Sequence, residues 1–322
     1  MVTMKLPHAA AATSPVGMAQ SLKQIAVDTV DRLLRGYMRY SPVLAGKRSA
    51  WALYDQKFGW RTRPKIATTP FSFKLHVRMP DHIQKVIWLT GRWEPCVTEF
   101  FRATLAPGDT FIDVGANIGY YSMLASRIVG DSGHVYAIEG SPTIVALLRD
   151  NVALNRATNV DAIHAIAGEH DGDQEFWASW DHNLGLSTAV ESRGRASRMR
   201  SEGRVRCGRL TSIVAEKQLF SARLIKIDVE GAERTVLEPL LERLPEFSHR
   251  TVWTVELSPE FCPGGQADID YVFNSFRAHG YSAFTIRNDY TLEMYLSRPR
   301  AAELRPLTAP PSAQADVVFL RQ

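Results

Sequence analysis

The sequence Phe111-Ile-Asp113-Val-Gly115-Ala-Asn117-Ile-Gly119 places a glycine turn between an apolar strand and a helical pattern. Gly115 and Gly119 permit a tight turn, so a ligand can approach the backbone and the free N–H groups at the start of the helix. The stretch therefore predicts a strand–turn–helix unit that binds a ligand. The alternative is a turn that needs glycine only for packing.

Around this turn, apolar strand patterns alternate with helical patterns. Strands are predicted at 111–114, 135–138, 162–167, 224–228, 252–257 and 317–320, and helices at 118–129, 142–156, 231–243 and 266–279. Such alternation indicates an α/β fold with a doubly wound, mostly parallel sheet covered by helices on both faces.

The N-terminal part has a different organisation. An amphipathic helix is predicted at 20–38, an irregular segment at 41–70, a strand at 71–77 and a helix at 94–105. We therefore expect a disordered leader at 1–19, a helical and extended region at 20–87, and one α/β domain at 88–322.

Composition and charge narrow the class of protein. The chain has 322 residues, of which 45% are hydrophobic, which is typical of a globular protein and excludes a wholly disordered chain. It contains no apolar run long enough for a membrane span and only three scattered cysteines, which favours a cytoplasmic protein with reduced thiols. Residues 1–95 hold 15 Lys and Arg against 5 Asp and Glu, which suggests either an anionic partner or a solvated basic surface.

An acidic residue follows the glycine turn at the tip of the next strand. Glu139 lies where a carboxylate usually binds the ribose hydroxyls of a nucleotide-like cofactor. The glycine spacing is GxxxG instead of the GxGxxG of dinucleotide-binding proteins, which argues against nicotinamide. Asp113 could accept a hydrogen bond from a cationic amino group, a group that S-adenosylmethionine has.

Three stretches together resemble the FkbM family of S-adenosylmethionine-dependent methyltransferases: FIDVGANIGYYSMLAS, AIEGSP and LIKIDVEGAE. The resemblance covers residues 88–258 well and the first 85 residues only in outline. It implies a seven-stranded Rossmann-like sheet and S-adenosylmethionine as cofactor. The residues that it implies for the cofactor are Asp113, Gly115, Asn117, Gly119 and Glu139, with Ala167 facing the adenine. One departure is Leu210-Thr211, where members often carry Leu-Asp.

A charged strand tip lies at the same predicted sheet edge. Lys226, Asp228 and Glu230 alternate along one face, and buried charge is costly unless it is paired or opens into a cleft. Neighbours on that face lie about 7 Å apart in a strand, so direct contact between them is expected to be marginal. The alternative is a structural ion cluster that includes Glu233 or Arg234.

Methyl transfer to a hydroxyl needs a positioned nucleophile and a base. Asp228, Glu230 and Glu256 are the candidate bases, and Lys226 could position the hydroxyl. We favour Asp228 near the methyl donor, with Glu230 or Lys226 toward the acceptor. No grouping has the ligand spacing of zinc, although strand-tip carboxylates could hold a divalent ion.

Two further groups are candidate substrate residues. His182 lies between the third and fourth predicted strands, where acceptors usually enter. Seven arginines lie between Arg193 and Arg209, and we interpret this segment either as a solvated loop or as a lid whose Arg198 and Arg200 bind an anionic acceptor. The segment lacks aromatic residues for stacking on RNA.

The expected activity is O-methylation of a sugar or another small hydroxylated metabolite. The sequence leaves two alternatives open: a nucleotide-dependent oxidoreductase, and a non-catalytic ligand-binding or scaffold protein that kept the methyltransferase sheet. It does not indicate an oligomeric state.

Overall fold

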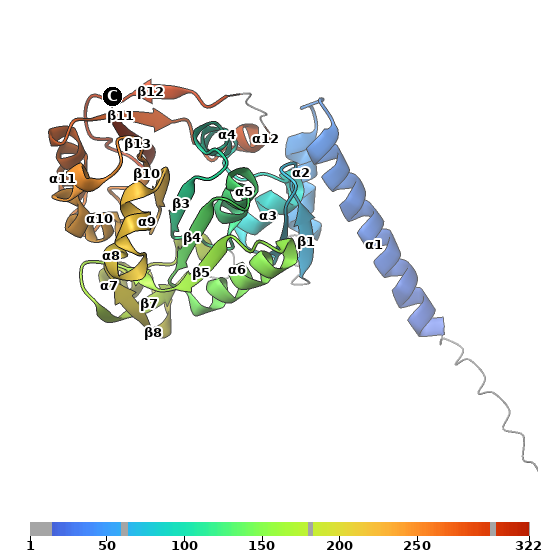
Figure 1. Ribbon diagram of the computed structural model, residues 1–322. Helices are drawn as coiled ribbons and strands as arrows, with labels where there is room; N and C mark the ends of the chain where they lie inside the picture. The colour runs from blue at the N-terminus through green and yellow to red at the C-terminus, as the bar shows by residue number, and fades with distance from the viewer. Residues whose placement is uncertain (1–14, 59–63, 180–182, 297–300, 322) are drawn as a thin grey trace, which may run out of the picture. The chain divides into compact units, whose positions relative to one another are not determined.

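The computed structural model describes residues 15–58, 64–179, 183–296 and 301–321. The chain divides into two compact units, Met1–Gly59 and Trp60–Gln322 (Figure 1). This boundary lies upstream of residue 88, where the sequence pattern suggested one, and the three-part division of the chain stays a prediction. Among the described residues, no helix is both long and apolar enough to cross a membrane.

The first unit contains two helices, α1 (Pro15–Tyr40) and α2 (Lys47–Lys57). Helix α1 confirms the helix predicted at 20–38 and begins inside the segment 1–19 that was expected to be a disordered leader. Helix α2 corrects the prediction of an irregular segment at 41–70, as does strand β1 in the second unit. Charged residues interrupt the apolar positions of α2, so its periodicity is weak in the sequence. The Lys47 ammonium donates to the Met38 and Ser41 carbonyls and fixes the connection between the two helices.

The second unit is built on a large sheet. Its strands are β3 (Thr110–Val114), β4 (His134–Glu139), β5 (Val160–His164), β9 (Leu224–Ile227), β10 (Val252–Leu257), β11 (Tyr281–Ile286), β12 (Leu304–Pro306) and β13 (Ala315–Arg321). Within the described residues the order is β12-β11-β13-β10-β9-β3-β4-β5. The strands from β10 to β5 are parallel, and β13, β11 and β12 join antiparallel. The seven-stranded sheet is thus confirmed, with β12 as an added edge strand.

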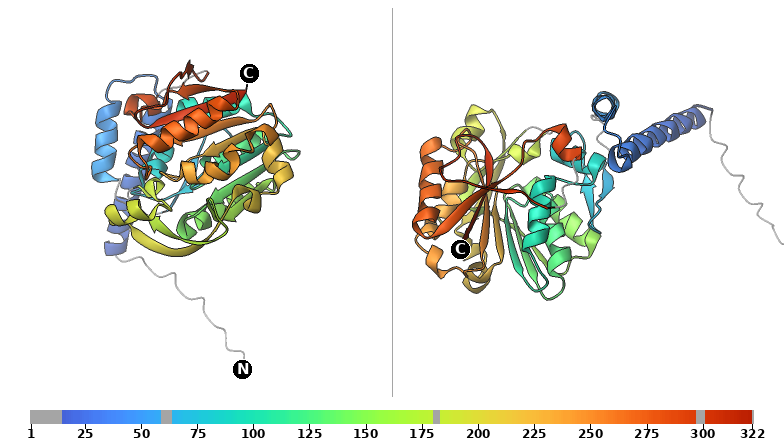
Figure 2. Two further views of the ribbon diagram at one scale, coloured as in Figure 1. Left: turned by 90° about the vertical axis from the view of Figure 1, so that its left-hand side faces the viewer. Right: turned by 90° about the horizontal axis from the view of Figure 1, so that it is seen from above.

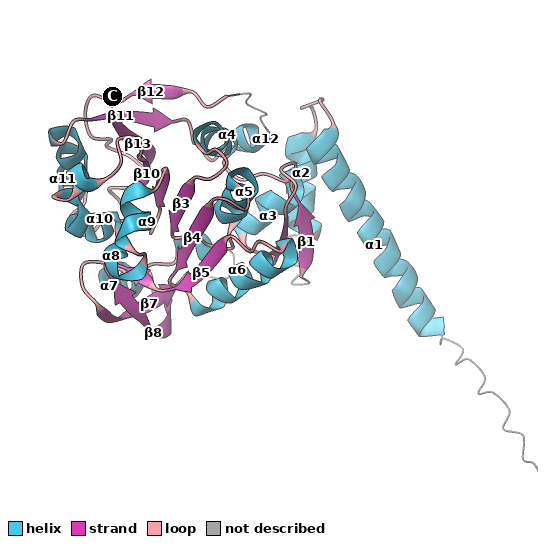
Figure 3. Ribbon diagram, in the orientation of Figure 1, coloured by secondary structure: helices cyan, strands magenta, loops and turns pink. Residues whose placement is uncertain are grey.

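Helices cover both faces of this sheet (Figures 2 and 3). The helices of the second unit are α3 (His82–Thr90), α4 (Pro95–Thr104), α5 (Tyr120–Val129), α6 (Pro142–Asn155), α7 (Glu191–Ala196), α8 (Leu210–Ile213), α9 (Glu216–Ser221), α10 (Glu233–Leu241), α11 (Gln266–Ala278) and α12 (Leu292–Leu296). Helices α4, α5 and α6 lie on one face, and α9, α10 and α11 lie on the other. The predicted doubly wound arrangement is therefore correct.

Aromatic side chains fill the core between the sheet and α10–α11. Phe276 stacks on Phe319 with ring centroids 4.1 Å apart, and Trp253 contacts Phe276 edge-on. Burial of each such side chain stabilises the fold by about 1.5–3 kcal/mol. This core fixes the positions of β9, β10 and β13. The charged residues described below lie at the carboxyl ends of β9 and β10 and at the amino end of β13.

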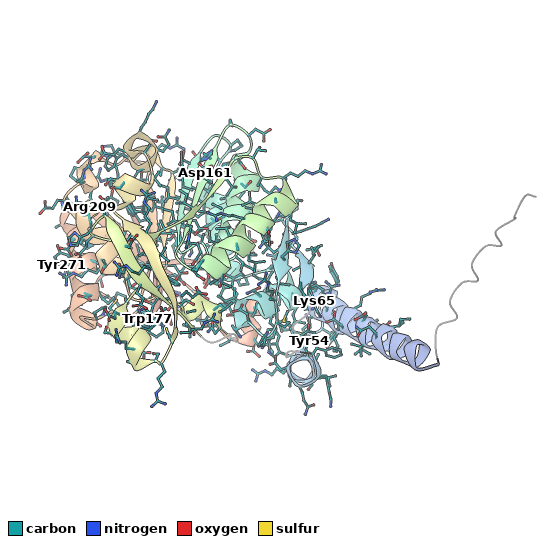
Figure 4. The ribbon with its side chains drawn as sticks, turned by 90° about the horizontal axis from the view of Figure 1, so that it is seen from below. Tyr54, Lys65, Asp161, Trp177, Arg209 and Tyr271 are labelled. Carbon is teal, nitrogen blue, oxygen red and sulfur yellow. The ribbon has the colours of Figure 1, made fainter. Side chains whose placement is uncertain are left out.

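The arginine-rich segment is not a loop. It forms α7 and the strand β8 (Arg200–Gly208), which pairs antiparallel with β7 (Gly172–Ala178) and parallel with the short strand β6 (Ile166–Ala167). Figure 4 labels Trp177 near the end of β7 and Arg209 just after β8, at opposite ends of this small sheet.

Strand pairing explains why this segment is ordered. Arg204 lies opposite Glu175 and Arg206 opposite Asp173 in the register of the two strands, and the Arg204 guanidinium donates to the Asp173 carbonyl. Val205 and Cys207 alternate with these arginines and are buried. The segment is therefore a half-buried strand whose polar face carries the arginines, a pattern that its charge density hides in the sequence.

Other boundaries also differ from the predictions. The strand expected at 162–167 is divided into β5 and β6, because β6 leaves the large sheet to pair with β8. The strand expected at 71–77 is shorter, since β2 (Lys74–Val77) begins after a turn and pairs with β1 (Lys65–Thr68). The sequence patterns did not predict α3, β7, β11, β12 and α12.

Candidate active site

A cavity of about 330 Å³ opens at the carboxyl ends of β3, β4, β9 and β10. Its wall includes the glycine turn, the tip of β4 and the charged tips of β9 and β10. Of the predicted site residues, the structure brings eight together around this one cavity: Gly115, Asn117, Glu139, Ala167, Lys226, Asp228, Glu230 and Glu256. Its volume lies near the lower end of the range for small-molecule sites, about 300–1,000 Å³.

The glycine turn packs directly against the turn that follows β9. Gly115 has φ of 80°, and a Cβ atom there would lie 1.8 Å from the Asp228 carbonyl oxygen. At Gly119, φ is 87° and a Cβ atom would lie 2.5 Å from Leu148 Cδ1. Gly115 is required by its backbone conformation and by close approach to backbone atoms, and Gly119 by its backbone conformation, so both have a packing role, and the Gly115 turn also lines the cavity.

Glu139 connects the tips of β3 and β4. Its Oε2 accepts a hydrogen bond from the Asn117 amide at 2.9 Å, and its Oε1 accepts one from the Ser141 amide at 2.8 Å. The side chain is buried at the cavity wall, and burial raises the pKa of this carboxyl to about 7. Each carboxylate oxygen has a second lone pair, so the group can accept further hydrogen bonds from hydroxyls in the cavity.

Asp113 lies behind the cavity wall. It is 1% exposed, and its Oδ2 accepts a hydrogen bond from the Ser122 hydroxyl at 2.6 Å. Its Oδ1 lies 4.0 Å from the Lys226 ammonium, and burial raises the pKa of the carboxyl. The cationic group that the structure brings to Asp113 is therefore the lysine, and the predicted contact with a cofactor amine stays a prediction.

Lys226 and Asp228 form a direct ion pair. The Lys226 ammonium lies 2.8 Å from Asp228 Oδ2, so the expectation of marginal contact was wrong. Strand β9 ends at Ile227, and the chain turns at Asp228 instead of continuing with extended spacing. Burial would lower the pKa of Lys226, but Asp228 and Asp113 outweigh it and raise that pKa. The lysine therefore remains protonated.

Glu230 occupies a left-handed position in the turn after β9, with φ of 54°. Arg193 of α7 donates to its backbone carbonyl, and the Arg193 guanidinium lies 3.5 Å from Glu230 Oε2. Glu233 accepts hydrogen bonds from the Val229 and Gly231 amides and so supports the turn. Of the two residues considered for a structural ion cluster, Glu233 thus holds the backbone, whereas Arg234 pairs with Glu238 and Asp268.

Glu256 lies near the end of β10 and is 6% exposed. Its Oε1 accepts hydrogen bonds from the Tyr290 hydroxyl at 2.9 Å and from the Gln314 amide at 2.7 Å. Burial and the neighbouring Asp228 raise the pKa of Glu256 well above its ordinary value. The same causes raise the pKa of Glu230.

Sequence reasoning missed a group of hydrogen-bonded residues that adjoins Glu256 through Tyr290. The Glu94 carboxylate accepts hydrogen bonds from the Tyr121 hydroxyl, the Tyr290 hydroxyl and the Asn288 amide, and the same amide binds Asp316. Glu94 begins the helix predicted at 94–105, and that pattern predicts no site role for it. Tyr121 lies in the quoted stretch after the glycine turn, whereas Asn288, Tyr290 and Asp316 lie in segments without a motif, so the association of these residues gives no signal in the sequence.

The remaining predicted residues that the structure describes lie apart from the carboxylates of the cavity. Ala167 lines the cavity beside Phe176, on an apolar wall that suits an adenine ring. Arg198 and Arg200 are exposed and do not line the cavity; in their segment, Arg193 is the arginine that contacts the turn after β9. His182 lies outside the described residues.

The family model for the methyltransferase FkbM domain matches residues 113–283, which is more than half of the chain. The chain belongs to the FkbM methyltransferase family. S-adenosylmethionine is the cofactor of this FkbM chain, and the groups around the glycine turn fit it: backbone amides, a buried carboxylate at Glu139 that can accept further hydrogen bonds, and an apolar wall at Ala167.

Curated relatives match parts of the FkbM chain. The 31-O-demethyl-FK506 methyltransferase FkbM of Streptomyces tacrolimicus is 28% identical over 158 residues, covering 41% of this chain and 60% of that protein. An arsenite methyltransferase of Halobacterium salinarum is 41% identical over 59 residues, covering 18% of this chain and 15% of that protein. The chain thus matches less than two thirds of the length of each of these relatives.

Solved structures with similar arrangements include a methyltransferase FkbM from Methylobacillus flagellatus, with a TM-score of 0.39 and 14% identity, covering 94% of this chain and 60% of that chain. Another is fibrillarin from Aeropyrum pernix with natively bound S-adenosyl-L-methionine. It has a TM-score of 0.37 and 11% identity, and the match covers 82% of this chain and 85% of that chain.

Proposed function

We propose that this protein is an S-adenosylmethionine-dependent O-methyltransferase that acts on a hydroxyl of a sugar or another small metabolite. The observation that carries the proposal is the single cavity, which is lined both by the glycine turn with Glu139 and by the Lys226–Asp228 pair. A methyl donor bound at the turn would thus lie in the same space as a base and a cation. The name of the relative from Streptomyces tacrolimicus supports oxygen as the methylated atom.

The donor half of the cavity contains the residues that would hold the cofactor. Glu139 would accept hydrogen bonds from the ribose hydroxyls, and Ala167 would contact the adenine. Gly115 and Asn117 belong to the turn against which the cofactor would lie. When bound, S-adenosylmethionine supplies an electrophilic methyl group on a cationic sulfonium. Asp113 would act indirectly, because its carboxylate holds Lys226 from behind the wall.

The acceptor half contains the groups that would handle the hydroxyl proton. Asp228 is the proposed base, since its side chain is 31% exposed and lines the cavity, while Lys226 fixes one of its oxygens. The protonated Lys226 would donate a hydrogen bond to the acceptor oxygen and orient it. Glu230 and Glu256 complete the wall on the far side of Asp228.

Calorimetric titration tests the donor half of this proposal. Wild-type protein is titrated with S-adenosylmethionine, S-adenosylhomocysteine and NADH, and the titrations are repeated with Glu139→Ala and with Glu242→Ala, a control on the exposed surface. We expect saturable binding of the first two ligands. Loss of hydrogen bonds to a charged group costs about 1.5–3 kcal/mol, which predicts roughly ten- to hundredfold weaker binding in Glu139→Ala only.

Two results would contradict the proposal. Binding of NADH without binding of S-adenosylmethionine would favour the oxidoreductase alternative. Unchanged affinity in Glu139→Ala would remove the carboxylate from the cofactor site.

A further inference from the structure

Three carboxylates meet at the acceptor side of the cavity. Asp228 and Glu230 follow β9, and Glu256 lies near the end of the adjacent strand β10. One oxygen atom from each residue lies within 4.8 Å of those from the other two, and all three residues line the cavity. Ligand oxygens around one Mg²⁺ ion lie about 3–4 Å apart, given Mg–O distances of about 2.1 Å. Small side-chain rotations would close the observed group to that geometry.

Glu256 presents an oxygen that nothing in the described residues satisfies. The side chain is more than nine-tenths buried, and Tyr290 and Gln314 hold Oε1 in place. Its Oε2 is buried and has no hydrogen-bond partner among the described residues, and the same is true of Glu230 Oε2. An unsatisfied buried carboxylate oxygen is costly, so a ligand that binds both oxygens would recover that free energy.

The surrounding charge favours a cationic ligand. Besides the three carboxylates, Glu94 and Asp316 lie in the connected hydrogen-bond network of Tyr290 and Asn288. Lys226 is already paired with Asp228 and lies 4.0 Å from Asp113, and Arg193 lies 3.5 Å from Glu230 Oε2. These two cations are fewer than the carboxyl groups around them, so ionising the three carboxylates together would leave buried negative charge without a counter-charge. A divalent cation would neutralise it at the point where the unsatisfied oxygens lie.

We propose that Asp228, Glu230 and Glu256 bind a divalent cation of the Mg²⁺ and Mn²⁺ class, which prefers carboxylate oxygens. The inference rests on the proposed function, because the cation would bind the acceptor beside the methyl donor. An acceptor with two adjacent hydroxyls would chelate the cation through both oxygens. The cation would lower the pKa of the hydroxyl and assist its deprotonation by Asp228. The acceptor class is therefore a vicinal diol, as in a sugar.

Binding of Mn²⁺ tests the site without any activity assay. The free Mn²⁺ signal is followed by electron paramagnetic resonance while the full chain is titrated, for wild type, Glu256→Gln, Asp228→Asn and the exposed control Glu242→Gln. We expect one bound ion per chain, displaced by Mg²⁺, and at least about tenfold weaker binding in the two site variants, since each loses a charged ligand. Glu242→Gln should match wild type, and thermal unfolding curves verify that each variant is folded.

Titration of the same samples with S-adenosylmethionine separates the two proposals. Cofactor binding without Mn²⁺ binding, or Mn²⁺ binding weakened equally in Glu242→Gln, would overturn the cation site and leave the proposed function standing. Mn²⁺ binding without cofactor binding would overturn the proposed function. If the Glu256→Gln chain does not fold, the Mn²⁺ affinity of Asp228→Asn decides whether the site exists. The Asp228 side chain is partly exposed at the cavity wall, so this variant is expected to fold.

Discussion

The donor half and the acceptor half of the cavity stabilise their buried carboxylates in different ways. Glu139 accepts hydrogen bonds from two backbone amides, and Asp113 accepts one from a serine on the helix that follows the turn. In the acceptor half, Glu256 depends on the side chains of Tyr290 and Gln314, which come from distant segments. Backbone donors hold Glu139 whatever the neighbouring side chains are, whereas substitutions can reshape the surroundings of Glu256.

This difference indicates how one fold can keep its cofactor and change its acceptor. The donor half needs only a strand, a glycine turn and the tip of the next strand. The acceptor half is assembled from α4, β9, β10 and the segments 288–290 and 314–316. Variation in those segments would alter acceptor specificity without disturbing the donor half.

The largest expected effect is on the glycine turn. Gly115→Ala places a Cβ atom 1.8 Å from the Asp228 carbonyl at a positive φ, and we expect a loss of about 4–5 kcal/mol in the free energy of unfolding. Gly203→Ala is the matched control, because φ is also positive there but no atom lies within 4 Å. It should cost only about 1 kcal/mol. Urea unfolding measures both, and equal losses would show that backbone conformation, not close packing, fixes the donor half.

The pH dependence of cofactor binding is the next test of the donor half. The pKa of Glu139 is about 7, above its ordinary value of 4.5, so the carboxyl is largely protonated below pH 7. Ribose hydroxyls donate best to the ionised form, so affinity should rise with pH up to about 7 and level off above it. Below pH 7 the dissociation constant should increase up to about tenfold per unit. Glu139→Gln should flatten the profile, and a persistent slope in that variant would assign the titration to another group.

Tyr290→Phe tests the acceptor half. The change removes the hydroxyl that donates to Glu256 at 2.9 Å and lies 3.2 Å from Glu94, and a lost hydrogen bond to a charged group costs about 1.5–3 kcal/mol. We expect kcat/KM for the acceptor to fall by roughly ten- to hundredfold, with unchanged affinity for S-adenosylmethionine. Weaker cofactor binding in this variant would contradict the separation of the two halves.

The smallest effect concerns the arginine-rich segment. Arg193→Ala removes the contacts with Glu230 and should raise the acceptor KM about five- to tenfold, equivalent to about 1–1.4 kcal/mol. Arg198→Ala and Arg200→Ala lie on exposed positions outside the cavity wall and should leave KM within about twofold, the size of effect that most surface substitutions have. Equal effects of all three substitutions would restore the interpretation of the segment as a lid.

Local patterns predicted the donor half, because its parts are close in sequence. Gly115, Gly119 and Glu139 belong to one strand–turn–helix–strand unit, and the close approach at both glycines confirms the turn. The acceptor half could be predicted only for residues on strand tips, such as Lys226 and Asp228. Glu94 and Tyr290 are 196 positions apart in the chain, and no local pattern indicates that they meet.

The arginine-rich segment shows a second reason why the sequence patterns did not predict part of the fold. Its charge density suggested a solvated loop, but the strand pairs with β7, where Glu175 and Asp173 lie opposite Arg204 and Arg206. The stabilising partner is some 30 residues away in the sequence, so composition alone could not predict the pairing.

The most direct test of the central claim is transfer of a labelled methyl group. Wild type and Asp228→Asn are incubated with labelled S-adenosylmethionine and a panel of sugars and other polyhydroxylated acceptors, and label in the product is counted. The account predicts O-methylated product with wild type, and turnover lower by about 10²–10⁴-fold in the folded Asp228→Asn chain, the usual contribution of a general base. Full activity in folded Asp228→Asn, or no product from any hydroxylated acceptor while a thiol or amine is methylated, would contradict it.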